Sequence, residues 1–390
     1  MKKGWVYKKL GEVCDFEGGS QPPKSEWISS PKEGYVRMLQ IRDFTKSRNA
    51  DVEYVKLSRK LRLCKSDDIL IGRYGASVGK ILTGLAGAYN VAIIKSMPNE
   101  KLIDKRFIRR FFESSLFQSV LVKVCSSRTA QAGFSKDDIK DIDIPVPSLS
   151  DQRRIVSRLD SAFSHIDKLK AKAEKQLTEA KALIQKALAE EMKPKEGWEE
   201  KKLGELCDII RGKRFVRADI VDDGVPCIHY GDIYTDYGLS VTKTKGCLMP
   251  ELAKKMRFAK KNDVVVVQAG ENNWDIGVGV AYLGEEPAAV HDACFILSHK
   301  QDPMYISYYL RSHNYHRYLI DYVHEGKICS FLKPALENAP FPLPPLSTQQ
   351  SIVTRLDALS SQVRELEENC RKTLAECDAL KQAMLREVFE

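Results

Sequence analysis

The sequence predicts an α+β protein with two β-rich modules of similar plan, separated by two long antiparallel coiled-coil helices. Three observations predict it: an internal repeat, a heptad pattern ending each half, and strand-like apolar runs between them. The 390 residues suffice for two to three ordinary domains. We expect modules at 1–147 and 194–346 and spacer helices at 148–193 and 347–390, arranged as a pseudo-two-fold dumbbell.

The internal repeat covers both ends of each half. Trp5–Asp15 recurs as Trp198–Asp208, and both copies contain Lys-Lys-Leu-Gly-Glu. Pro145–Asp160 recurs in the same way as Pro342–Asp357. A match of this length is not expected by chance, so the chain consists of two tandem copies of one plan.

Each half ends in a predicted long helix. Ser150 and Ser347 are suitable N-caps, and Gln350 stands at the capping-box position of the second helix. Apolar or small residues then recur every seven residues, which predicts a coiled-coil seam. In the first helix the predicted seam residues are Ile155, Leu159, Ile166, Leu169, Ala173, Ala180, Leu183 and Ala187. In the second they are Ile352, Leu356, Val363, Leu366, Cys370, Cys377, Leu380 and Met384.

The two modules should be β-rich with a few helices. Asp67–Gly72 and Asn262–Val267 read as buried strands, and each leads into a glycine-bearing loop. One helix is expected from Lys105 to Leu121, and its copy from Met304 to Ile320. The predicted strands and helices of the two modules match, while their loops differ in sequence. This is the pattern expected of two modules that read two different targets.

Polar, basic and aromatic residues in these loops suit contacts to DNA bases, because Arg pairs with guanine and Asn or Gln with adenine. The candidates of the first module are Gln21, Lys24, Arg37, Gln40, Arg42, Arg73, Tyr74, Ser77 and Lys80. Those of the second are Arg211, Lys213, Arg214, Arg217, His229, Tyr230, Gln268, Asn272, Asn273 and Trp274. A solvated surface side chain is the alternative for each residue taken singly.

The net charge of +9 is unevenly distributed. Residues 1–150 hold 27 Lys and Arg against 17 Asp and Glu, whereas residues 196–346 hold 18 against 21. The first half therefore favours a polyanionic partner, and the second does not.

The sequence shows no signature of a catalytic site, a metal site or a membrane span. Gly75–Lys80 resembles a phosphate loop, but the glycine spacing is too short and Ile81 replaces the hydroxyl residue. His313 and His316 lack a companion glutamate, and the ten cysteines contain no C-x-x-C. We expect no catalytic residue, no metal and no cofactor in this chain, and a cytoplasmic location because no membrane span or signal sequence is visible.

The paired Trp-x-x-Lys-Lys-Leu-Gly-Glu openings, the paired proline-rich helix entries and the two heptad helices together resemble a specificity subunit of a Type I restriction-modification system. The loop Ile71–Lys80 also resembles the target-recognition domains of that family. The second module departs at Ser330–Leu336, where the first has Gly133–Ile139.

The resemblance implies a non-catalytic DNA-specificity subunit whose two target-recognition domains each read one half of a bipartite, asymmetric double-stranded DNA site. The helices would set the gap and dock two methyltransferase subunits carrying S-adenosylmethionine. Restriction motor-nuclease subunits using ATP and Mg would complete a DNA adenine methyltransferase and endonuclease that defends against foreign DNA. Two alternatives stay open: a self-sufficient duplicated nucleic-acid-binding protein, and a coiled-coil scaffold without DNA readout.

Overall fold

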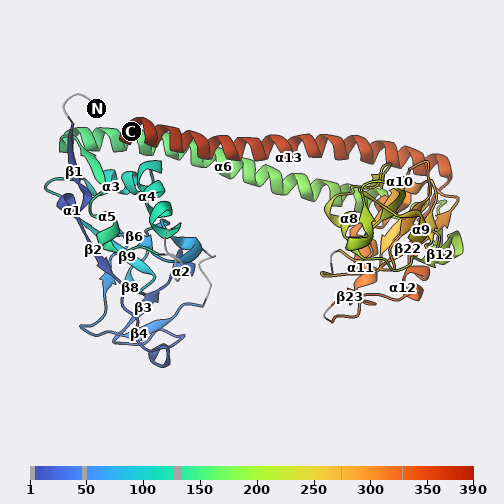
Figure 1. The fold of residues 1–390 in the computed structure, drawn as a ribbon, viewed down its shortest axis with the longest axis horizontal. Coiled ribbons are helices and arrows are strands. Elements are labelled where there is room, and N and C mark those ends of the chain that lie inside the picture. The colour runs from blue at the N-terminus through green and yellow to red at the C-terminus, as the bar shows by residue number, and fades with distance from the viewer. Residues whose placement is uncertain (1–4, 46–50, 127–132, 274, 327) are drawn as a thin grey trace. The chain divides into compact units, whose positions relative to one another are not determined.

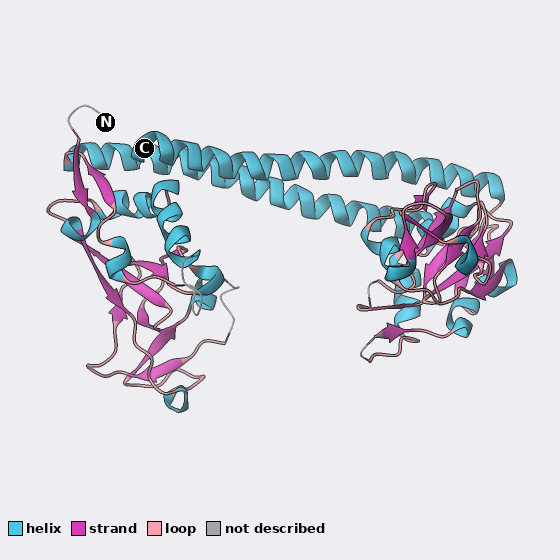
Figure 2. Cartoon of the chain, in the orientation of Figure 1, coloured by secondary structure: helices cyan, strands magenta, loops and turns pink. Residues whose placement is uncertain are grey.

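A computed structural model describes residues 5–45, 51–126, 133–273, 275–326 and 328–390. The chain forms two compact units, Met1–Ala173 with Lys372–Glu390, and Glu174–Arg371. Each unit contains one β-rich module and part of two long helices, α6 (Leu149–Glu191) and α13 (Leu346–Phe389) (Figures 1 and 2). Within the described residues no helix is both long and apolar enough to cross a membrane.

The module of the first unit contains two four-stranded sheets. One has the order β2-β9-β6-β7 and the other β4-β3-β8-β5, with β3 and β8 parallel. A separate antiparallel pair, β1 with β10, ties the start of the module to the entry of α6. The strands are β1 (Val6–Lys9), β2 (Cys14–Gly18), β3 (Tyr35–Leu39), β4 (Tyr54–Lys56), β5 (Leu63–Cys64), β6 (Ile69–Gly72), β7 (Ile81–Leu82), β8 (Gly87–Tyr89), β9 (Ile93–Pro98) and β10 (Asp143–Val146).

The module of the second unit repeats this plan with additions. Its sheets have the orders β12-β22-β18-β20-β15 and β13-β16-β14-β21-β17, and β14 and β21 are again parallel. The pair β11 with β24 corresponds to β1 with β10. The strands are β11 (Glu199–Lys202), β12 (Cys207–Arg211), β13 (Ile220–Val221), β14 (Val225–Ile228), β15 (Ser240–Val241), β16 (Gly246–Leu248), β17 (Phe258–Ala259), β18 (Val264–Val267), β19 (Ala269–Gly270), β20 (Gly279–Tyr282), β21 (Ala288–Val290), β22 (Cys294–His299), β23 (Cys329–Ser330) and β24 (Pro340–Leu343).

Short helices cover the sheets. Those of the first module are α1 (Leu10–Val13), α2 (Ile41–Thr45), α3 (Lys105–Phe112), α4 (Ser115–Ser126) and α5 (Lys136–Ile139). Those of the second are α7 (Leu203–Leu206), α8 (Tyr230–Thr235), α9 (Pro250–Ala253), α10 (Pro303–Tyr309), α11 (His313–Ile320) and α12 (Lys333–Glu337).

Each single module helix predicted from sequence is in fact two helices. The first breaks between α3 and α4, and the second between α10 and α11. A buried serine stands at each break: the Ser312 hydroxyl accepts a hydrogen bond from the Tyr315 amide, and the Ser114 hydroxyl donates to the Phe111 carbonyl. These local hydrogen bonds compete with a continuous helix, so the break occurs where the periodicity alone showed none.

The N-caps of the long helices lie earlier than the predicted serines. Helix α6 starts at Leu149, and the Ser148 hydroxyl, not that of Ser150, accepts the Asp151 amide at 3.2 Å. Helix α13 starts at Leu346, so Ser347 lies inside its first turn. The expected N-caps were therefore wrong by one or two residues, because proline is tolerated immediately before the first turn.

A buried glutamine at the start of each long helix connects it to its module. The Gln152 amide accepts a hydrogen bond from the Asp104 backbone amide at 2.7 Å and donates to the carbonyls of Leu102 and Pro147. Gln349 does the same at the Asp302 amide and the Pro344 carbonyl. Both glutamines are fully buried. These bonds fix the direction in which each helix leaves its module.

One of the two predicted seam rows is correct and the other is displaced by one residue. The row containing Leu159, Ile166, Ala173 and Ala180 is buried, as is its counterpart Leu356, Val363, Cys370 and Cys377. The second row was predicted through Ile155 and Ile352 at the helix starts and then through four leucines. Ile352 is buried and Ile155 is half-buried, but the side chains of Leu169, Leu183, Leu366 and Leu380 are 39–52% exposed.

The second seam row follows the next residue along each helix. Inward positions of α6 are Val156, Phe163, Lys170, Leu177 and Ile184, and those of α13 are Val353, Ser360, Glu367, Leu374 and Lys381. The prediction failed because several of these inward positions are polar. The leucines one residue earlier fit the apolar heptad pattern better. Lys170 and Lys381 are accommodated because they are ion-paired with Asp378 and Asp167.

Those two ion pairs show that α6 and α13 run antiparallel in the first unit, since the chain positions ascend on one helix and descend on the other. Further along the same two helices, in the second unit, Arg355 pairs with Glu191 at 2.8 Å, so the partner in α13 keeps descending as the position in α6 ascends. The α+β class, the two modules of similar plan and the antiparallel long helices are confirmed.

Candidate nucleic-acid interface

Corresponding loops of the two modules are held by the same backbone contacts. A Cβ atom added to Gly19 would lie 2.0 Å from the Asn90 carbonyl oxygen, and one added to Gly212 would lie 2.2 Å from the His291 carbonyl oxygen. Only glycine permits so close an approach. The loop after β2 is thereby fixed beside the loop before β9, and the loop after β12 beside that before β22.

In the first module, four of the predicted DNA-contacting residues lie together around two carboxylates. Lys24, Gln40 and Arg42 all bond to Glu53: the Arg42 Nη2 atom is 2.7 Å and the Gln40 Nε2 atom 2.9 Å from the Glu53 Oε2 atom. Arg37 pairs with Asp43 at 2.9 Å. These bonds hold the cations in defined positions while Lys24 remains exposed.

Glu53 stays ionised in this cluster. Partial burial alone would raise its pKa, but hydrogen bonds from Lys24 and Gln40 and the charge of Arg42 lower the pKa of Glu53 below its usual value. The carboxylate therefore acts as an anchor for three donors.

The glycine loop of the first module is a second group. The Arg73 guanidinium lies 5.1 Å from the centroid of the Tyr74 ring, and its Nε atom donates to the Phe134 carbonyl at 3.1 Å. Ser77 is half-buried and Lys80 is exposed. Gln21 is exposed on the loop between β2 and β3.

The second module places aromatic rings where the first places the charged cluster. His229 is the N-cap of α8 and follows β14, as Gln40 precedes α2 and follows β3. Its ring centroid is 4.4 Å from that of Tyr230, 4.7 Å from that of His291 and 6.2 Å from that of Phe215. Burial lowers the pKa of His229 to about 4, with the nearby His291 and Arg217 as further causes, so the ring is neutral at pH 7.

Exposed cations surround this aromatic group. Arg211 at the end of β12 is exposed, and so are Lys213, Arg214 and Arg217 on the segment that follows. The Arg211 Nε atom donates to the Asp292 carbonyl at 2.6 Å, and Arg217 lies 3.6 Å from Asp232. Asp232 corresponds to Asp43 of the first module, so both modules place an arginine beside the same aspartate position.

Two predicted DNA contacts of the second module are buried in the structure. His229 is buried and its Nδ1 atom accepts a hydrogen bond from the Gly231 amide. Gln268 is buried too, and its side-chain amide donates to the Phe331 carbonyl at 2.8 Å. One polar atom of each side chain is thus bonded to the backbone, whereas the Gln268 Oε1 atom is buried without a hydrogen-bond partner in the described part of the chain.

The other candidates of the second module are more accessible. Asn272 is exposed and bonds to Asp275, Asn273 is half-buried and bonds to Glu325, and Tyr230 is half-buried. Trp274 lies outside the described residues.

Sequence reasoning missed the residues that organise these surfaces: Glu53 and Asp43 in the first module, Phe215 and His291 in the second. No sequence pattern pointed to Glu53, since it lies outside any motif. The aspartates could have been found, because aligning Gln40–Asp43 with His229–Asp232 leaves the aspartate unchanged while the residues before it differ.

The described residues contain no group of three or more His, Cys, Asp or Glu side chains that could hold a metal ion. Residues 2–179 and 195–376 each match the sequence profile described as Type I restriction modification DNA specificity domain. The chain belongs to this family. The two matches cover both halves of the repeat, which explains why the modules share one plan.

Named relatives agree with this membership. The chain is similar to the Type I restriction enzyme MjaVIII specificity subunit of Methanocaldococcus jannaschii, at 26% identity over 93% of this chain and 87% of the relative. It is also similar to the EcoBI specificity subunit of Escherichia coli, at 23% identity over 99% of this chain and 85% of the relative.

Two solved structures share the fold. A chain from a study of complex assembly and conformational transition in the type I R-M system has a TM-score of 0.76 at 21% identity, covering 99% of this chain and 98% of that one. The HsdS subunit of Thermoanaerobacter tengcongensis has a TM-score of 0.54 at 21% identity, covering 100% and 97%.

Proposed function

We propose that this family member is the non-catalytic subunit that gives a Type I restriction-modification enzyme its DNA sequence specificity. One observation carries the proposal: the two modules hold chemically different surfaces on the same backbone frame. The first surface is built from Lys24, Gln40 and Arg42, and the second from Tyr230 and the arginines after β12. Each would read one half of a bipartite, asymmetric site, and the paired helices would set the gap between the halves.

The exposed leucines of the long helices support docking of methyltransferase subunits. Leu169 lies between Asp167 and Lys170, and Leu380 lies between their partners Asp378 and Lys381, so the two leucines are level with each other in the first unit. The internal repeat predicts that Leu183 and Leu366 lie level with each other in the same way in the second unit. Apolar side chains exposed side by side on paired helices are typical of a surface that a further helix covers.

One leucine pair in each unit supports two methyltransferase subunits per chain. In this proposal the methyltransferase partners carry S-adenosylmethionine, and separate motor-nuclease subunits that use ATP and Mg complete the restriction enzyme. The present chain supplies recognition and assembly, in the cytoplasm where such an enzyme meets foreign DNA.

Methylome sequencing tests the proposal. This chain would be expressed with its cognate methyltransferase subunit in a host that lacks DNA methylation, beside a control strain without this chain. We expect a split motif methylated only when the chain is present. A folded complex that methylates no new motif would contradict the proposal and favour the scaffold alternative.

The leucine surface is tested separately by replacing Leu169 and Leu380 with Glu. We expect weaker association with the methyltransferase subunit in sedimentation velocity, with the melting temperature of the chain alone little changed, because both side chains are already exposed. The matched control replaces Lys168 and Lys175, exposed polar residues of α6, with Glu. Equal association of the leucine variant and the wild type would exclude this docking surface.

A further inference from the structure

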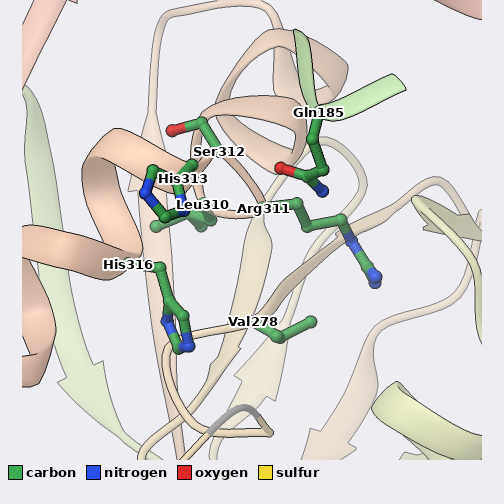
Figure 3. Close-up of a pocket in the computed structure, with 7 residues that line it drawn as sticks. All are labelled: Gln185, Val278, Leu310, Arg311, Ser312, His313 and His316. Atoms are coloured by element: carbon green, nitrogen blue, oxygen red, sulfur yellow. The ribbon is translucent and has the colours of Figure 1, made fainter. Parts of the chain in front are cut away.

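A groove in the second unit gathers positive charge between the long helices and the module. It consists of two adjoining cavities of about 420 and 450 Å³, which share Gln185 of α6 and Arg311 of the turn between α10 and α11. Figure 3 shows Gln185, Arg311, His313 and His316 around the first cavity. We call this the Arg311 groove, and its polar lining residues are Lys181, Gln185, Tyr308, Arg311, Ser312, His313, His316, Ser360, Arg364 and Glu367.

Arg311 is a half-buried cation without an acidic partner among the described residues. Its Nε atom donates to the Gly279 carbonyl at 3.3 Å and its Nη2 atom to the Gly238 carbonyl at 2.5 Å. Among the described residues no carboxylate lies within ion-pair distance of it. Burial lowers the pKa of Arg311 to about 10, so the guanidinium is still charged at pH 7. A partly buried charge whose hydrogen bonds go only to neutral carbonyls is incompletely compensated.

Two further cations line the same groove. Lys181 and Arg364 are exposed, and in the described part of the chain neither has a carboxylate within ion-pair distance. The one carboxylate of the lining, Glu367, is paired with Arg371 at 2.9 Å. The groove therefore carries net positive charge in a module whose overall charge is negative.

Helix α11 adds to this field. Its first turn opens at the groove with His313 and His316, and its sequence contains Arg317 but no acidic residue. The amino-terminal end of a helix carries partial positive charge and unpaired backbone amides. The Ser312 hydroxyl accepts a hydrogen bond from only one of those amides, that of Tyr315.

At the corresponding position of the first unit the positive charge is balanced by carboxylates. Counted from the buried serines at the helix breaks, Glu113 stands where Arg311 stands in the second unit. There Arg110 pairs with both Glu113 and Asp160, at 2.5 and 2.6 Å. The accumulation of cations is therefore a property of one module and is not required by the shared fold.

We propose that the Arg311 groove binds a phosphodiester of the DNA backbone next to the half-site read by the second module. The adjoining segment supports DNA over another anion: Val278, which lines the groove, lies a few residues along the chain from Asn272 and Asn273, two of the predicted DNA contacts. Lys, Arg, Gln and helix amino termini are the groups that contact phosphates in protein–DNA complexes. Such a contact would position the module without selecting a base.

This inference rests on the proposed function, and the complex with the methyltransferase subunit is the material that tests it. The variants are Lys181→Gln, Arg364→Gln and the double variant, because both side chains are exposed and their loss should leave the fold intact. Binding is measured by fluorescence anisotropy over a salt series, with one DNA that contains the methylated motif and one that lacks it.

We expect the slope of log affinity against log salt to become less steep by about 0.9 for each lost phosphate contact. The loss should be equal for both DNAs, and the methylated motif should be unchanged. Lys186→Gln with Lys372→Gln is the matched control, since these exposed lysines of the same helices do not line the groove.

Three results would overturn the inference. The first is a salt slope equal to that of the control. The second is weaker assembly with the methyltransferase subunit, which would mark a site for an acidic protein segment. The third is inorganic phosphate bound at the groove, detected by ³¹P NMR without DNA, together with an unchanged DNA slope. Failure of the proposed function is distinguishable, because the wild-type complex would then methylate no split motif.

Discussion

The two modules share a backbone frame and differ in the side chains it presents. Gly19 and Gly212 make the same close approach, and Gln152 and Gln349 make the same buried hydrogen bonds. The first module then presents cations tied to Glu53, whereas the second presents rings with exposed arginines around them. Contacts that set the backbone involve buried atoms and tolerate little change, while the exposed surface takes no part in the core and can diverge.

The charge difference follows the same division. The first module is basic overall, and its predicted DNA contacts include cations held by carboxylates. The second has a slight excess of acid, and its positive charge is concentrated after β12 and in the Arg311 groove. A module with little general attraction for DNA needs its few cations in defined places, because phosphate contacts supply much of the binding free energy.

The largest expected effect tests whether the helix pairs are built alike in both units. Ile166→Ala should lower the free energy of local unfolding of α6 by ~2–5 kcal/mol, because the side chain is buried. Leu169→Ala should change it by less than ~0.5 kcal/mol, because Leu169 is exposed. Hydrogen exchange of the helix amides measures both. Val363 and Leu366 should repeat the contrast in α13, and a larger effect at the leucines would restore the seam predicted from sequence.

The buried glutamines test whether the modules hold their helices equally. Gln152→Leu and Gln349→Leu each leave a buried backbone amide and carbonyl without a partner, at a cost of ~2–4 kcal/mol in stability. Urea unfolding followed by hydrogen exchange in each module measures it. Gln350→Leu is the control, since Gln350 is exposed. A loss in only one module would show that the shared contact contributes unequally to the stability of the two modules.

Surface variants sharpen the chemical difference between the modules. Gln40→Ala should weaken discrimination at one half-site by ~1–3 kcal/mol, and Arg214→Ala should do so at the other. Each variant complex would methylate a library of oligonucleotides randomised in both half-sites. Relaxation at both half-sites by one substitution would mean that the modules do not read independently.

Acid should affect the second module first, because six of the seven histidines lie in the second unit. Burial lowers the pKa of His229 to about 4 and lowers that of His291, so the unfolded chain takes up protons before the folded one as pH falls. The stabilisation is present above pH 6.5 and is lost between pH 6.5 and 4. We expect His229 to account for roughly 1–2 kcal/mol by pH 5.

Hydrogen exchange of both modules from pH 7 to pH 5 measures this difference. The one histidine of the first unit, His165, is exposed, and the lowered pKa values of Glu17 and Glu53 act only below about pH 4.5. His229→Gln should reduce the acid sensitivity of the second module. Equal loss in both modules above pH 5 would contradict the assignment.

The repeat, the two modules and the long helices could be predicted because each leaves a regular mark on the sequence. The row Leu159, Ile166, Ala173 was found because its residues are small or apolar at every heptad. Its companion row was missed because Lys170 and Lys381 interrupt it, and their acceptability depends on Asp378 and Asp167 of the other helix. Ion-pair partners more than two hundred residues away leave no local periodicity.

The same distinction applies to the candidate interface. The sequence by itself determined the family, the duplication and which loops carry polar and basic residues, because these properties depend on residue type and spacing. Only the tertiary structure decided that Lys24, Gln40 and Arg42 meet at Glu53, that His229 and Gln268 are buried, and that Arg311 has no acidic partner. Burial and ion pairing depend on neighbours brought together from distant segments, and those neighbours are set by packing.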